Sequence, residues 1–292
     1  MQFVDQWGET SYSGYGFKTW LSNNKDVALS ISFLYLMFVF YAPRYIPRFM
    51  GEAGTEKNKI MQEKVKKVWV VWNLFLSAFA FYGTTRVFPP LIKNFMKYGI
   101  HDTFCTFRPE EFYTTEIGTA LGLFTMSKLP EFGDTVFLLL LGKKLPFLQF
   151  FHHTSMFLFV WFAYEQGSSI FITAAAYNYF VHTIMYFYFA LAEAGLKNVV
   201  KPFGIYITAL QITQMVGGLF FTGYSVYHNY RKVFDPSAPG CPGTDITVSR
   251  TQLLVYIFNF YLFSEMFVKS YILPPPKRAE KPAAGAEKKK SA

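Results

Sequence analysis

The 292-residue chain is too apolar and too aromatic for an ordinary soluble domain: 52% of its residues are hydrophobic, 21% aromatic and only 16% charged. This composition predicts an all-α polytopic membrane protein. The net charge of +9 raises nucleic acid as a partner, but the basic residues fall in loops and in the tail between apolar segments, so membrane topology explains them better.

Seven apolar stretches approach the ~20 residues that a helix needs to cross a bilayer. They cover about residues 27–41, 68–88, 113–141, 146–164, 169–192, 203–227 and 248–273. Pro43 is expected to close the first helix, and Pro89 with Pro90 the second, because proline cannot donate a backbone hydrogen bond. Pro130 and Gly133 interrupt the third stretch.

The charge of the loops predicts the orientation of these helices. With the N-terminus outside the cytosol, seventeen Lys and Arg residues fall on the cytosolic side and eight on the other. Basic residues accumulate in cytosolic loops, so we expect a cytosolic C-terminus. Residues 1–273 would form one seven-helix transmembrane domain, and residues 274–292 a disordered basic tail. Lys289 and Lys290 near the end of that tail resemble a dilysine signal, which favours the endoplasmic reticulum membrane.

The two cysteines fall on one side of the membrane in this topology. Cys105 follows the second predicted helix, and Cys241 follows the sixth. Both loops face the non-cytosolic compartment, where disulfides persist. We therefore expect a disulfide between them rather than two unpaired thiols.

Four of the predicted helices carry polar residues at helical spacing. These are Lys128, Glu131, Asp134 and Thr135 on the third, Gln149, His152 and His153 on the fourth, Asn178, His182 and Tyr186 on the fifth, and Thr208, Gln211 and Gln214 on the sixth. In lipid such residues turn inward, pair or line a cavity. The polar residues of the sixth helix could instead form contacts between helices. The charged residues of the third helix could instead form an ion-pair network near the membrane surface. Together the four helices favour one enclosed polar pocket.

Histidines are the reactive groups that this pocket can supply. Gln149, His152 and His153 share one helix face. A single histidine there would be interpreted as a core residue that is hydrogen-bonded to a neighbouring helix. Two adjacent histidines with a third polar group favour a functional site. His101 and His228 are placed in loops, which leaves three imidazoles, too few for a di-iron centre and the whole supply for one zinc ion. We therefore expect no bound metal. Neutral imidazole can instead act as a general base, or as a nucleophile that accepts an acyl group from a thioester.

Four motifs, in order, resemble those of the ELO (ELOVL) family of very-long-chain fatty acid elongases, the membrane 3-ketoacyl-CoA synthases. The family's Lys-x-x-Glu-x-x-Asp-Thr appears at residues 128–135, His-x-x-Met-Tyr at 182–186 and Thr-x-x-Gln-x-x-Gln at 208–214. Its His-x-x-His-His box appears at 149–153 as Gln-Phe-Phe-His-His. Gln149 can hydrogen-bond but cannot carry a proton, so we interpret it as a positioning group.

The resemblance implies an enzyme that condenses a long-chain acyl-CoA with malonyl-CoA and releases 3-oxoacyl-CoA, CO2 and CoA, with no bound cofactor. It implies seven helices, six of which close around an acyl tunnel, and embedding in membrane lipid. A 3-ketoacyl-CoA reductase, a dehydratase and an enoyl-CoA reductase would act downstream as partners. A seven-helix receptor or transporter is the alternative class.

We expect His152, His153 and His182 to hold the chemistry, with an acyl-imidazole on His152 and assistance from His182. The expected orienting groups are Gln149, Asn178, Tyr186, Gln211 and Gln214. The candidates for binding the CoA phosphates are the cytosolic lysines Lys143, Lys144, Lys197 and Lys201, which equally fit as plain topology markers.

Overall fold

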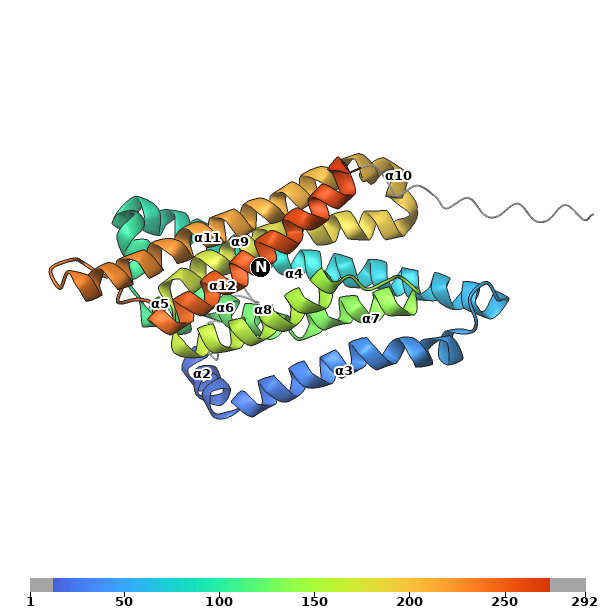
Figure 1. Ribbon diagram of the computed structural model, residues 1–292, viewed down its shortest axis with the longest axis horizontal. Coiled ribbons are helices and arrows are strands. Elements are labelled where there is room, and N and C mark those ends of the chain that lie inside the picture. The colour runs from blue at the N-terminus through green and yellow to red at the C-terminus, as the bar shows by residue number, and fades with distance from the viewer. Residues whose placement is uncertain (1–12, 274–292) are drawn as a thin grey trace, which may run out of the picture.

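The computed structural model describes residues 13–273, and that part of the chain consists of helices and short connections, without a β-strand (Figure 1). The helices are α2 (Gly14–Asn23), α3 (Lys25–Met50), α4 (Glu56–Cys105), α5 (Pro109–Tyr113), α6 (Glu116–Ser127), α7 (Gly133–Leu140), α8 (Phe147–Gln166), α9 (Ser169–Leu191), α10 (Lys197–Val200), α11 (Gly204–Phe234) and α12 (Ile246–Phe267). The all-α prediction is confirmed. The predicted tail at 274–292, with its lysine signal, lies outside the described residues.

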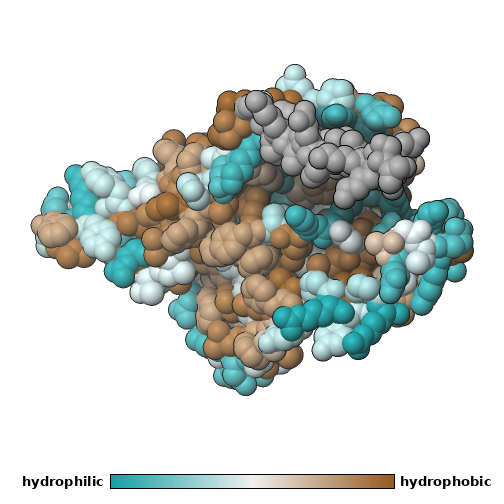
Figure 2. Space-filling model, turned by 45° about the vertical axis from the view of Figure 1, so that its right-hand side comes forward, coloured by the Kyte–Doolittle hydropathy of each residue, from teal (hydrophilic) through white to brown (hydrophobic). Residues whose placement is uncertain are grey.

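Several of these helices are suited to a bilayer. Between residues 13 and 273, four helical stretches are long and apolar enough to cross a membrane, namely Lys25–Met50, Glu56–Cys105, Ser169–Phe234 and Ile246–Ile272. Figure 2 shows apolar residues over the middle of one face, with hydrophilic residues gathered toward its ends. These features are those of a multi-pass membrane protein.

Two predicted helix ends are wrong. Helix α3 continues through Pro43, and α4 continues through Pro89 and Pro90. Proline removes one backbone hydrogen bond, but in apolar surroundings the neighbouring backbone groups still gain most by staying helical. The break in α4 comes later, at Gly99, where a positive φ of 73° interrupts the helix.

The third predicted helix is interrupted where the sequence indicated. Helix α6 ends at Ser127, the segment Pro130–Phe132 is a 3-10 turn, and α7 begins at Gly133. The ring of Phe132 stacks on that of Tyr35 from α3, with 4.0 Å between their centroids. This contact anchors the turn in the protein interior.

Helix α9 lies at the centre of the packing. It runs along α4 and also touches α6 and α11, while α12 packs on α11 and α8, and α3 packs on α8 (Figure 1). Gly83 lets α4 approach α9, because a Cβ there would overlap the ring of Tyr179. The hydroxyl of Tyr179 in turn donates to the carbonyl of Ala120 at 2.8 Å, which fixes α9 against α6.

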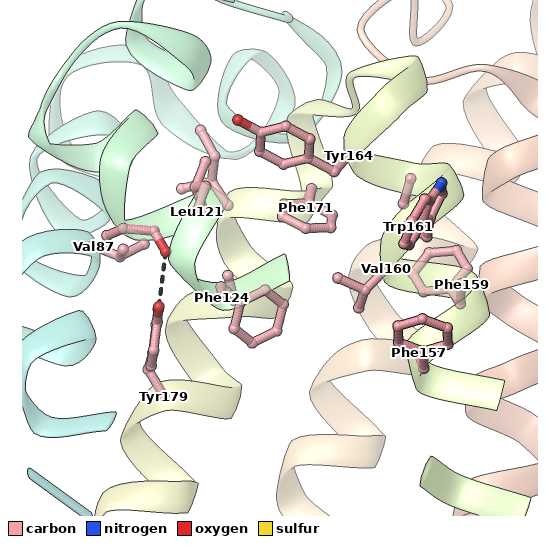
Figure 3. Close-up of a cluster of buried hydrophobic side chains, with 14 of the residues drawn as sticks. Val87, Leu121, Phe124, Phe157, Phe159, Val160, Trp161, Tyr164, Phe171 and Tyr179 are labelled. Atoms are coloured by element: carbon pink, nitrogen blue, oxygen red, sulfur yellow. Dashed lines mark hydrogen bonds between the residues drawn. The ribbon is translucent and has the colours of Figure 1, made fainter. Parts of the chain in front are cut away.

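An aromatic core occupies the end of the bundle where α8 and α9 are joined. Phe124, Tyr164 and Phe171 pack there with their neighbours on α6, α8 and α9 (Figure 3). At the same end, a disulfide joins Cys105 to Cys241. The core holds the C-terminal half of α8 and the N-terminal half of α9, and their other halves carry His152, His153 and His182.

Candidate active site

The free halves of α8 and α9 form the wall of a cavity of about 450 Å³, to which α4, α7, α11 and α12 also contribute. Most of its wall is apolar, and its polar lining comprises Asn73, Asp134, Lys143, Gln149, His152, His153, Asn178, His182, Tyr186, Tyr188, Glu193, Thr208, Gln211, Gln214 and Tyr271. The structure therefore brings residues from four separate sequence motifs to one cavity, of a size typical for small-molecule sites.

His182 belongs to a buried network that extends behind the cavity. Nζ of Lys128 donates to Oε1 of Glu131 at 2.7 Å and to Oδ1 of Asn178 at 3.0 Å. Nδ2 of Asn178 lies 3.0 Å from Nε2 of His182, and Nδ1 of His182 lies 3.9 Å from Oε1 of Glu131. Lys128 and Glu131 are only 3% and 6% exposed, so this ion pair is inside the protein rather than at its surface.

His152 has a partner that the sequence analysis missed. Its Nδ1 lies 2.8 Å from Oδ1 of Asn259 on α12. Asn259 is 1% exposed and does not line the cavity, so it supports the imidazole from behind. A signal was present in the sequence, because Asn259 is a lone amide in the apolar run Tyr-Ile-Phe-Asn-Phe-Tyr at 256–261.

Gln149 contacts His153. Its Nε2 lies 2.7 Å from Nε2 of His153, one helical turn away on α8. The ring of His153 also meets the edge of Phe132, at a centroid distance of 6.4 Å. The glutamine at the first position of the box thus has a direct hydrogen-bonding partner inside the box.

Asp134 has partners other than the predicted one. An ion-pair network among the third-helix charges would pair Asp134 with Lys128, but six residues are about 1.7 helical turns, and the 3-10 turn intervenes. Its carboxylate instead accepts from Nε1 of Trp72 at 2.9 Å and from the hydroxyl of Tyr186 at 2.8 Å. The hydroxyl of the neighbouring Thr135 lies 2.7 Å from that of Tyr35. The carboxylate thereby joins α7 to α4 and α9, and Thr135 joins α7 to α3.

The four candidate lysines separate into two groups. Lys143 lines the cavity, with Nζ 2.7 Å from Oε1 of Glu193 and 4.4 Å from the ring centroid of Trp69. Lys144, Lys197 and Lys201 are exposed and do not line the cavity. Only Lys143 is therefore placed to touch a molecule that occupies the cavity as it stands.

Two glutamines of α11 complete the polar wall. Gln211 donates to the sulfur of Met185 at 3.0 Å, which is a weak acceptor. Within residues 13–273, the side chain of Gln214 has no hydrogen bond, although it is 5% exposed and lines the cavity. These amides keep hydrogen-bonding capacity for a bound molecule. Thr208, from the same motif, also lines the cavity, and its hydroxyl lies 3.3 Å from that of Tyr271.

Comparison with known proteins places the chain in a family. The family model described as ELO, the GNS1/SUR4 family, matches residues 20–279. The chain belongs to this family. It is 42% identical to fatty acid elongase 1 of Trypanosoma cruzi (strain CL Brener), over all of both chains. It is 43% identical to fatty acid elongase 1 of Trypanosoma brucei brucei (strain 927/4 GUTat10.1), over 91% of this chain and 88% of that protein. With fatty acid elongase 2 of Trypanosoma cruzi the identity is 39%, over 94% and 96%.

The chemistry available to this member of the ELO family is that of imidazoles and amides in a largely apolar cavity. Imidazole can attack a carbonyl carbon or move a proton, and amide N–H groups can stabilise a developing oxyanion. In the described part of the chain, no three His, Cys, Asp or Glu side chains are grouped to hold a metal ion. The same surroundings suit a substrate that joins an apolar tail to a reactive carbonyl group.

Proposed function

We propose that this chain is a fatty acid elongase, an acyltransferase of the 3-oxoacyl-CoA synthase type. It condenses a long-chain acyl-CoA with malonyl-CoA and releases 3-oxoacyl-CoA, CO2 and CoA. Membership of the ELO family and the names of the relatives support the substrate class. The observation that carries the proposal is the convergence of His152, His153 and His182 on one cavity with apolar walls.

The proposed reaction has two stages on one imidazole. A neutral His152 attacks the thioester carbonyl of the acyl-CoA, the C–S bond breaks, and CoA leaves as a thiolate that takes a proton from water. Malonyl-CoA then loses CO2, and the electron pair of the broken C–C bond gives an enolate. The enolate carbon attacks the acyl group, the C–N bond breaks, and His152 returns to its neutral form.

The surrounding residues would serve this route in distinct ways. His182, on the facing helix, is close enough to Asn178 and Glu131 to be held in place while it assists proton movement. The side-chain amides of Gln211 and Gln214 would donate hydrogen bonds to the carbonyl oxygens of the substrates, where negative charge develops during both stages.

Access from the cytosol fits the polyanionic character of CoA. Lys143 is at the cavity and paired with Glu193, so a CoA phosphate would compete with that carboxylate for the ammonium group. Lys144, Lys197 and Lys201 would add positive charge around the entrance. The acyl tail would lie against the apolar wall of the cavity, beyond the histidines.

We propose the following setting for this reaction. Seven helices cross the endoplasmic reticulum membrane, six of them form a closed bundle around the acyl tunnel, the N-terminus is lumenal and the C-terminus cytosolic. The basic loops and the positions of the apolar stretches support this layout. Activity needs no bound metal, and separate reductases and a dehydratase complete the elongation cycle. A receptor or transporter has no evident use for three converging imidazoles.

The test is condensation by the purified protein in detergent or liposomes, supplied with acyl-CoA and carbonyl-labelled malonyl-CoA and no other enzyme. We expect labelled 3-oxoacyl-CoA, with CO2 released in equal amount. His152→Ala is expected to remove this product, whereas the matched control His101→Ala, outside the cavity, should retain it. Pure, folded protein that makes no 3-oxoacyl-CoA across a series of acyl chain lengths would contradict the proposal.

A further inference from the structure

Asn259 holds its side chain in one orientation. Nδ2 donates to the backbone carbonyl of Val255 at 2.8 Å, and an amide nitrogen can only donate whereas a carbonyl can only accept. The other end of the amide, Oδ1, therefore faces Nδ1 of His152, 2.8 Å away. Because Oδ1 is an acceptor, Nδ1 must carry the proton. In a neutral imidazole this leaves Nε2 with its free electron pair.

The other two histidines are arranged differently. Lys128 can only donate, so Oδ1 of Asn178 faces it, and Nδ2 of Asn178 donates to Nε2 of His182. The electron pair of that nitrogen is thereby engaged. Nε2 of His153 is likewise within hydrogen-bonding distance of Gln149. Among the three, His152 alone has an Nε2 without a hydrogen bond within residues 13–273.

We propose that Asn259 is a positioning residue that fixes the tautomer of His152 and so makes its Nε2 the nitrogen that takes the acyl group. This inference rests on the proposed function. When Nε2 attacks the thioester carbon, the C–S bond breaks and CoA leaves as a thiolate. The acylated ring then carries a positive charge, and its Nδ1–H donates to Oδ1 of Asn259. That hydrogen bond becomes charge-assisted as the charge develops, so it stabilises the transition state more than the resting enzyme. Attack by the enolate breaks the C–N bond and restores the neutral ring with its proton still on Nδ1.

An amide suits this place better than a carboxylate would. A carboxylate buried behind His152 would carry a full charge in the membrane interior, which is costly without a partner. The neutral Asn259 leaves the imidazole neutral and nucleophilic before substrate arrives. A third group that orients an imidazole is a recurring element of nucleophilic sites.

The experiment compares Asn259→Leu, which removes the acceptor oxygen at similar size, with Ser249→Ala on the same helix. Ser249 is fully buried and donates to the carbonyl of Asp245, about 15 Å from Asn259 along the helix axis. Both variants are mixed with acyl-CoA alone, and the rate of CoA release in the first turnover is measured. We expect Asn259→Leu to slow this release by about 10²-fold, because a misplaced nucleophile loses that much. Ser249→Ala should leave it unchanged.

A second measurement reports the tautomer directly. The chain has only five histidines, so ¹⁵N-histidine NMR of the full-length protein can resolve the signal that His152→Ala removes. We expect this signal to show a proton on Nδ1 in the wild type and to lose that signature in Asn259→Leu. A wild-type ring protonated on Nε2, or equal CoA release in the wild type and in Asn259→Leu, would overturn the role of Asn259. If instead the wild type releases no CoA without malonyl-CoA, the covalent step of the proposed function is the part that fails.

Discussion

Replacing Lys128 with methionine separates the structural role of the buried ion pair from its role in the site. Nζ of Lys128 is bonded to the carboxylate of Glu131 and to the amide oxygen of Asn178. In Lys128→Met, Glu131 keeps only the hydroxyl of Ser127, at 3.2 Å, as a hydrogen-bond donor on the same oxygen. The amide of Asn178 also loses the contact that decides which of its ends faces His182.

The loss of stability and the loss of activity can be estimated separately from the structure. Both charged side chains are more than nine-tenths buried, and removing one partner of such a pair costs about 3–5 kcal/mol, since the remaining charge has no compensation. The neutral pair Lys128→Met with Glu131→Gln removes the charges of both partners, so most of this stability should return. Activity should not return with it, because Asn178 is still free to rotate, and we expect a loss of about 10²-fold in both variants.

Thermal unfolding in detergent and condensation with labelled malonyl-CoA measure the two quantities on the same preparations. We expect the single variant to be unstable and slow, and the double variant to be stable and equally slow. A double variant that regains full activity together with stability would refute the view that Lys128 orients Asn178. A single variant as stable as the wild type would show that the pair is not desolvated.

Three further outcomes are expected. His152→Ala and His182→Ala should each abolish condensation while the unfolding transition stays close to that of the wild type; a folded variant with near-full activity would remove that histidine from the mechanism. Gln149→His should keep substantial activity, because an imidazole can still bond to His153; loss of activity without loss of fold would show that the site needs an amide there. A strong chelator should leave turnover unchanged; stoichiometric zinc or iron, with activity lost on chelation and restored by that metal, would contradict the acyl-imidazole route.

Much of the architecture could be predicted because membrane helices are recognisable in a sequence as long apolar segments. The strand-free fold and the interruption near Pro130 both followed from such patterns. The ends of α3 and α4 did not, because proline was read as a stop although an apolar environment favours continued helix on both sides of it. The extension of α4 beyond Pro89 and Pro90 depends on packing that no local pattern reports.

The cavity was predictable where its residues repeat along one helix face. His152, His153 and Asn178 were found in this way, and the structure places them on one cavity. Contacts between helices were harder. Asp134 bonds to Trp72 and Tyr186 rather than to Lys128, because pairing depends on how α4, α7 and α9 face one another. Asn259 escaped notice because a single amide has no periodicity.

The most direct test of the central claim is to trap the acyl group on the protein. Purified protein is mixed with an isotope-labelled acyl-CoA in the absence of malonyl-CoA, quenched rapidly and digested for peptide mass spectrometry. The acyl-imidazole route predicts one acyl group per chain on the peptide that contains His152, with one equivalent of CoA released and the label discharged when malonyl-CoA is added. Protein that condenses both substrates at full rate, yet never carries an acyl group and releases CoA only when malonyl-CoA is present, would contradict it.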